Sequence, residues 1–124
     1  MTYRLKPLCL DLKICQGADF DETFVLLDSN KNPINISGWQ LYGQIRQWQN
    51  ETALLIATWS STANDGSCVI TPLLGQFQLF IPASLTIDYI FTSPAYYDIL
   101  ALKPTGRTER FMMGRMFLSN GVSV

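Results

Sequence analysis

The side chains in this sequence that could act in catalysis or metal binding are mainly carboxylates, because the chain contains no histidine. Without imidazole, the common serine and cysteine triads and most zinc sites are excluded. Asp19, Asp21 and Glu22 could supply calcium ligands, but they lack the glycine-punctuated loop of calcium motifs and are better explained as a solvated strand end. Asp88 and Asp98 could be the carboxylate pair of a glycosidase, but nothing in the sequence indicates that they are positioned on either side of a cleft. We therefore predict no catalytic residue, metal or cofactor, and a protein that is not an enzyme.

Aromatic side chains are the second group that could bind a ligand. A sugar-binding platform could be lined by Trp39, Trp48, Trp59, Tyr96 and Tyr97. Trp39 and Trp59 fall in apolar patterns and are predicted to belong to the core. Trp48 lies in a polar stretch between Gln47 and Gln49 and is predicted to be exposed. An exposed tryptophan suits a subunit interface as well as a sugar site, since aromatic residues dominate interface hot spots.

Three cysteines are present, and their spacing indicates free thiols. Cys9 and Cys15 lie in a segment predicted to be extended, which would separate them by about 20 Å. A disulfide requires Cα atoms within about 7 Å, so these two cannot pair without a bend, whereas Cys68 could pair with either. The odd number and the spacing fit neither a zinc site nor a redox pair. We expect reduced, buried thiols in a chain made in a reducing cytoplasm.

Alternation of apolar and polar residues with a period of two predicts the strands that must position these groups. With turn signals about every 8–12 residues, it predicts an all-β fold: an antiparallel β-sandwich of seven or eight strands with at most one short helix, within residues 82–90. The predicted strands are 8–15, 19–28, 39–46, 54–59, 68–71, 76–81, 96–102 and 108–119, with a short edge strand at 34–38. The predicted core contains Trp39, Leu41, Ile45, Phe77, Leu79 and Ile99.

Length and composition predict one domain over residues 8–124, preceded by an N-terminal arm of residues 1–7, in a chain of 124 residues. Charged residues make up only 15%, against a usual value of about 25%. Either neighbouring subunits cover part of the surface, or Gln, Asn, Ser and Thr supply its polarity. Arg107 and Arg110 are expected to rim a hairpin turn, and no basic cluster indicates a nucleic-acid partner. No apolar run reaches about 18 residues, so no membrane partner is predicted.

Several short motifs occur in an order that resembles a known family. The matching segments are Gln16-Gly17-Ala18-Asp19-Phe20, Asp28 to Trp39, Gln44-Ile45-Arg46, Tyr97-Asp98-Ile99 and Gly114 to Ser119. In this order they resemble a family of small tailed-bacteriophage virion proteins, which are immunoglobulin-like β-sandwich domains of tail, neck and baseplate. Asn35 stands where the family usually has Asp, and Trp39 where it usually has Tyr. The match covers most of the chain, and the family has no catalytic motif to carry over.

The resemblance implies a structural component of a virion, assembled in the host bacterial cytoplasm, whose partners are other virion proteins and copies of itself. We expect the N-terminal arm and the loop of residues 47–52 to contact neighbouring subunits; an arm without contacts and a Trp48 folded back on the sandwich are the alternative. The interface candidates are Tyr3, Leu5, Trp48, Arg107 and Arg110. The alternative function is a receptor- or carbohydrate-binding module on a phage fibre. Exposed aromatic side chains in a concave patch, rather than across a flat contact, would favour it.

Overall fold

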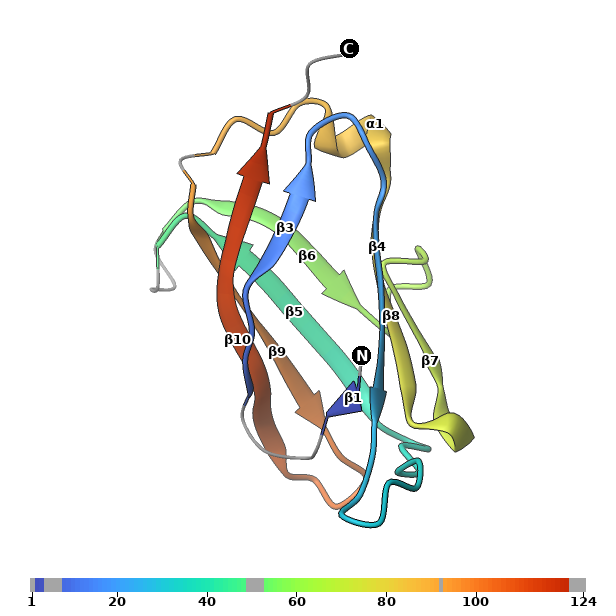
Figure 1. Cartoon of the computed structure of the whole chain (residues 1–124). Coiled ribbons are helices and arrows are strands. Elements are labelled where there is room, and N and C mark those ends of the chain that lie inside the picture. Colours follow the sequence, from blue (N-terminus) through green and yellow to red (C-terminus); the bar gives the residue numbers. More distant parts are fainter. Residues whose placement is uncertain (1, 4–7, 49–52, 92, 121–124) are drawn as a thin grey trace.

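The computed structural model describes residues 2–3, 8–48, 53–91 and 93–120, which form ten strands and very little helix (Figure 1). The strands are β1 (Thr2–Tyr3), β2 (Leu8–Cys9), β3 (Leu12–Cys15), β4 (Phe20–Leu26), β5 (Gln40–Arg46), β6 (Leu55–Ser60), β7 (Cys68–Thr71), β8 (Gln76–Ile81), β9 (Ala95–Leu102) and β10 (Thr108–Ser119). The described helical segments are α1 (Ala83–Thr86) and a 3-10 turn, η1 (Pro72–Leu74). The all-β class and the short helix within residues 82–90 are confirmed.

Two sheets face each other and enclose the core (Figure 1). The four-stranded sheet has the order β1-β4-β8-β7; the six-stranded sheet has the order β2-β10-β9-β5-β6, with β3 also pairing with β10. Aromatic rings join the two sheets. Phe77 of β8 and Phe111 of β10 have ring centroids 5.6 Å apart, and Phe20 of β4 lies 5.9 Å from Trp59 of β6. Burial of these rings between the sheets stabilises the packing of one sheet on the other.

The predicted alternation decides which side chains enter this core. The predicted core residues Leu41, Ile45, Phe77, Leu79 and Ile99 are all buried, which confirms that part of the prediction. Gly43 also faces the core, directly across from Trp59 on β6. A Cβ atom at position 43 would lie 2.9 Å from the Trp59 ring. The glycine therefore makes room for the largest side chain of the core.

The sixth predicted core residue, Trp39, is only partly buried, and that prediction was wrong. The chain turns at Gly38, whose φ of +80° suits glycine, and the backbone N–H of Trp39 donates to the Ile36 carbonyl at 3.2 Å. β5 begins only at Gln40, so the strand alternation does not extend back to Trp39. Ile36 fills the core position instead, and Trp39 packs at its margin with the Lys103 ammonium 5.1 Å from the ring centroid.

The strand pairing is mixed rather than purely antiparallel, contrary to the prediction. β1 pairs in parallel with β4, and β2 and β3 pair in parallel with β10. The reason is connectivity: β3 and β4 follow each other in sequence but belong to different sheets, so they form no hairpin. The predicted strand 8–15 is also interrupted at Leu10 and Asp11. The predicted edge strand at 34–38 is absent, and an isolated bridge joins Leu27 to Pro33.

The two long sides of the molecule differ in how the sheets end. On the N-terminal flank, β1 ends the four-stranded sheet, and β2 and β3 end the six-stranded sheet. On the β6–β7 flank, β6 and β7 end the two sheets, and no other described strand pairs with their outer edges. The loop of residues 61–67 connects these two strands, and the Ser67 hydroxyl accepts the Ser60 backbone N–H at 3.0 Å.

All three cysteines are free. Cys68 is buried, and burial raises the pKa of its thiol to about 12. Cys9 and Cys15 are exposed, so the prediction of buried thiols was wrong for these two. In β3 the alternation places Leu12 and Ile14 in the core, which turns Cys15 outward.

Candidate binding groove

The register of β5, β9 and β10 brings outward-facing side chains into rows across the six-stranded sheet. Three rows result: Arg115–Tyr96–Arg46, Met113–Asp98–Gln44 and Arg110–Leu100–Tyr42. Residues paired directly across antiparallel strands have Cβ atoms about 4.5–5.5 Å apart on the same face. β9, in the middle, thus joins the side chains of β10 to those of β5.

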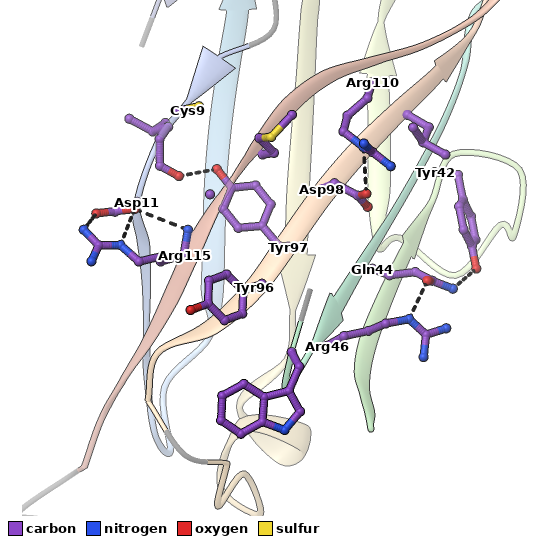
Figure 2. A pocket seen from close by; sticks show the side chains of 15 residues that line it. Cys9, Asp11, Tyr42, Gln44, Arg46, Tyr96, Tyr97, Asp98, Arg110 and Arg115 are labelled. Carbon is purple, nitrogen blue, oxygen red and sulfur yellow. Dashed lines mark hydrogen bonds and ion pairs between the residues drawn. The ribbon is translucent and has the colours of Figure 1, made fainter. Parts of the chain in front are cut away.

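These rows form the floor of an open hollow of about 890 Å³ on the outer face of the sheet (Figure 2). We call it the groove; it is lined by the nine residues of the rows together with Cys9, Leu10, Asp11, Trp48, Tyr97 and Gly114. Its floor side chains lie on the face of the sheet opposite the core. Those side chains therefore take no part in the packing of the two sheets on each other and are accessible to a ligand.

A close approach of Leu10 to Gly114 builds one edge of the groove. The Tyr97 hydroxyl donates to the Leu10 carbonyl at 2.5 Å. A Cβ atom at position 114 would lie 2.1 Å from that carbonyl oxygen, so only glycine permits the approach. The contact coincides with the break between β2 and β3, where Asp11 lies beside Arg115 (Figure 2).

Two ion pairs occupy four of the charged side chains of the groove. Arg115 donates to the two carboxylate oxygens of Asp11 at 3.2 and 2.7 Å, and Arg110 donates to Asp98 at 3.0 Å. The hydrogen bonds from Arg115 hold the pKa of Asp11 below its ordinary value of 3.8, and the same contact raises the pKa of Arg115. Both pairs are partly exposed, so we expect them to position the side chains more than to stabilise the fold.

Arg46 differs from the other two arginines because neutral groups hold it. Its Nε donates to Gln44 Oε1 at 3.0 Å, and its Nη1 donates to the Ala53 carbonyl at 2.8 Å. Gln44 in turn donates to the Tyr42 hydroxyl at 2.6 Å, so Arg46, Gln44 and Tyr42 on the outer face of β5 form one hydrogen-bonded chain (Figure 2). Across the described parts of the chain, no carboxylate forms an ion pair with Arg46. The two hydrogen bonds fix its position, and its charge is not neutralised by any residue that the structure describes.

Three aromatic side chains of the groove are exposed or partly exposed. Tyr42 and Trp48 are 44% and 57% exposed, and Tyr96 is partly buried between Arg46 and Arg115 in its row. Aromatic rings offer flat apolar faces, and the neighbouring polar groups offer hydrogen bonds. Each carboxylate among the described groove residues is held by an arginine.

The structure distributes the predicted interface residues over separate regions. Trp48 and Arg110 line the groove. Arg107 is exposed in the hairpin loop between β9 and β10. Tyr3 belongs to β1, whose backbone pairs with β4, and Leu5 lies outside the described residues. Their contacts with other subunits stay a prediction.

The predicted aromatic platform is assembled only in part. Trp48, Tyr96 and Tyr97 all line the groove, although Tyr97 is buried, whereas Trp59 belongs to the core and Trp39 lies outside the groove. Trp48 is exposed and Trp59 is core, as predicted.

Sequence reasoning missed the polar half of the groove. The alternation in residues 39–46 already placed Tyr42, Gln44 and Arg46 on one face. The pairing of β5 with β9, which begins only at Ala95, could not be inferred from that alternation. This pairing is what sets Tyr96 beside Arg46.

The acidic residues at the start of β4 line a second hollow, of about 350 Å³. Asp19 accepts the Ala83 backbone N–H at 2.7 Å, and Asp21 accepts a hydrogen bond from the Gln78 amide at 2.7 Å. These bonds anchor α1 and the neighbouring strand β8 to β4. Among the residues that the structure describes, no group of three or more His, Cys, Asp or Glu could hold a metal ion.

Comparison with known proteins does not identify the chain. No protein-family model matches it, and no curated protein sequence matches it. No helix within the described ranges is long and apolar enough to cross a membrane. The function is therefore argued from the short motifs and from the geometry of the surface.

Proposed function

We propose that the chain is a non-enzymatic structural component of a tailed-phage virion, with an immunoglobulin-like arrangement of its two sheets. It is assembled in the host bacterial cytoplasm and acts through contacts with other virion proteins and with copies of itself. The ordered motifs between Gln16 and Ser119 support the family resemblance, and the β6–β7 flank supports a role in assembly.

The observation that carries this proposal is the set of apolar side chains exposed on and beside the strands that end the two sheets. Leu54, just before β6, and Leu73 in η1 are 68% and 75% exposed, and Leu74, Leu55 and Val69 are also exposed. A strand edge without a neighbour presents unpaired N–H and C=O groups, which another chain can use. Exposed apolar residues next to such edges are typical of surfaces that neighbours cover.

Mass spectrometry of purified virions, followed by measurement of incorporation, tests the proposal. Leu54→Lys and Leu73→Lys should each reduce incorporation at least about tenfold, because a lysine placed in a contact must lose its hydration. Leu85→Lys is the matched control, since Leu85 is 53% exposed on α1, away from the β6–β7 flank. Absence of the protein from particles, or wild-type incorporation of both flank variants, would contradict the proposal.

A second function, binding of a receptor or carbohydrate, is favoured by one specific observation. The exposed aromatics Tyr42 and Trp48 line a concave surface beside polar side chains rather than a flat contact. The volume of about 890 Å³ is within the range of about 300–1,000 Å³ that small-ligand sites occupy. Binding of the purified chain to an oligosaccharide array tests this function, and assembly variants on the β6–β7 flank should not affect it.

A further inference from the structure

We propose that the groove binds a saccharide that carries a carboxylate, with the carboxylate on Arg46 and a sugar ring against Tyr96. This inference rests on the second proposed function and names the ligand class of that site. It follows from the donors of Arg46, from the charge balance of the groove and from the position of the aromatic rings.

The first step is the state of the Arg46 guanidinium. Gln44 and the Ala53 carbonyl use two of its N–H groups, at 3.0 and 2.8 Å. An arginine has more N–H donors than these two bonds use, and its planar fork matches the two oxygens of a carboxylate. Because its neighbours already hold the side chain, a ligand would lose little additional side-chain entropy by binding it.

The second step is the charge balance. Among the residues that the structure describes, the groove contains three arginines and two aspartates, and the aspartates Asp98 and Asp11 are ion-paired with Arg110 and Arg115. One positive charge, that of Arg46, is left without a partner in the described structure, although the whole chain has a net charge of −1. A carboxylate supplies one negative charge. A phosphate monoester carries about −1.5 to −2, so the balance favours the carboxylate.

The third step is the remaining surface. Tyr96 lies directly across from Arg46 on the neighbouring strand, and Trp48 follows Arg46 by two residues in the sequence. A sugar ring offers an apolar C–H face to an aromatic ring and hydroxyl groups to Gln44 and Asp98. A peptide that extends the sheet is not the natural occupant, because β9 already pairs with β10 and β5 on its two sides.

The test begins with the purified full chain and an array of uronic-acid and sialic-acid oligosaccharides, their carboxyl-methyl esters, and sulfated and neutral oligosaccharides. We expect at least one carboxylate saccharide to bind about tenfold more tightly than its own ester, because charged hydrogen bonds are lost on esterification. If no acid binds better than its ester, the proposal is wrong. Binding of neutral sugars alone would leave carbohydrate binding standing and refute the carboxylate.

Variants then locate the binding. Arg46→Gln should lower affinity for the acid about tenfold and leave affinity for the ester within about twofold. Tyr96→Ala should weaken both. Lys31→Gln, which removes an equal charge from an exposed turn outside the groove, should change neither. Equal losses for Arg46→Gln and Lys31→Gln would indicate only a general charge effect and overturn the assignment.

The exposed cysteines provide an independent readout. Cys9 lines the groove, and Cys15 lines the second hollow. Saturating acidic saccharide should slow alkylation of Cys9 by iodoacetamide and leave alkylation of Cys15 unchanged, as measured by peptide mass spectrometry. Protection of Cys15 without protection of Cys9 would place the saccharide in the second hollow and overturn the assignment. If Arg46→Gln instead lowers incorporation into particles and no saccharide binds, the groove is a protein contact and the proposal is wrong.

Discussion

On the N-terminal flank, the six-stranded sheet ends in β2 and β3, and the break between them lies against Gly114 of β10. On the β6–β7 flank, both sheets end in strands that have no described neighbour beyond them, and leucines are exposed beside them. On the N-terminal flank, the chain thus covers the sheet edge with its own backbone, in a contact that requires glycine at position 114. On the β6–β7 flank, no described strand covers the sheet edges, which leaves them available to another chain. Mutations on the first side should alter stability, and mutations on the second should alter assembly.

The largest effect is expected for Gly114→Ala. The new Cβ would lie 2.1 Å from the backbone oxygen of Leu10, so the β2–β3 edge would have to move, at a cost of about 3 kcal/mol in the free energy of unfolding. Urea denaturation measures this. Gly106→Ala, which meets no atom within 4 Å but has a φ of +86°, should cost only about 1 kcal/mol. Similar losses for both variants would show that the approach of Leu10 does not stabilise the flank.

Deletion of residues 1–6 is expected to have the next largest effect. It removes the pairing of Thr2 with Val25 and of Tyr3 with Leu26, and should lower the free energy of unfolding by about 1–2 kcal/mol. Tyr3→Ala keeps the backbone pairing and should be closer to the wild type. If the deletion variant keeps its stability but enters particles less often, the arm contacts other subunits instead of stabilising the fold.

Asp11→Asn should have a smaller effect, and one that depends on pH. Because Arg115 holds the pKa of Asp11 below 3.8, the carboxylate contributes stability above that pH and loses it as the pH falls through the lowered value. The difference in thermal midpoint between wild type and variant should therefore be present at pH 7 and vanish in strong acid. A difference that persists at low pH would mean that packing, not charge, is responsible.

The smallest effect on stability is expected on the β6–β7 flank. Leu54→Lys and Leu73→Lys should change the free energy of unfolding by no more than about 0.5 kcal/mol, because both side chains are already largely exposed. Urea denaturation of the isolated chain checks this. A large destabilisation would mean that these leucines belong to the fold, and lowered incorporation would then say nothing about contacts.

Part of the fold and of the groove could be predicted because alternation is a local property. The face that each residue of β5 and β8 presents was readable, and so were the exposure of Trp48 and the burial of Trp59. Trp39 was wrongly assigned to the core because the chain turns at Gly38 and β5 begins only at Gln40. The alternation of apolar and polar residues does not by itself show where a strand begins. The parallel neighbours of β1, β2 and β3 were missed because strands in different sheets form no hairpin.

The amino-acid sequence by itself determined the all-β class, most of the core side chains and the absence of imidazole chemistry, since each depends on composition or on neighbours within a few residues. Only the tertiary structure decided that Tyr96 lies beside Arg46, that Asp11 meets Arg115, and that one sheet edge is covered while another is left open. These contacts join segments far apart in the chain. Their choice depends on the total burial and hydrogen bonding of the whole fold, which no local pattern contains.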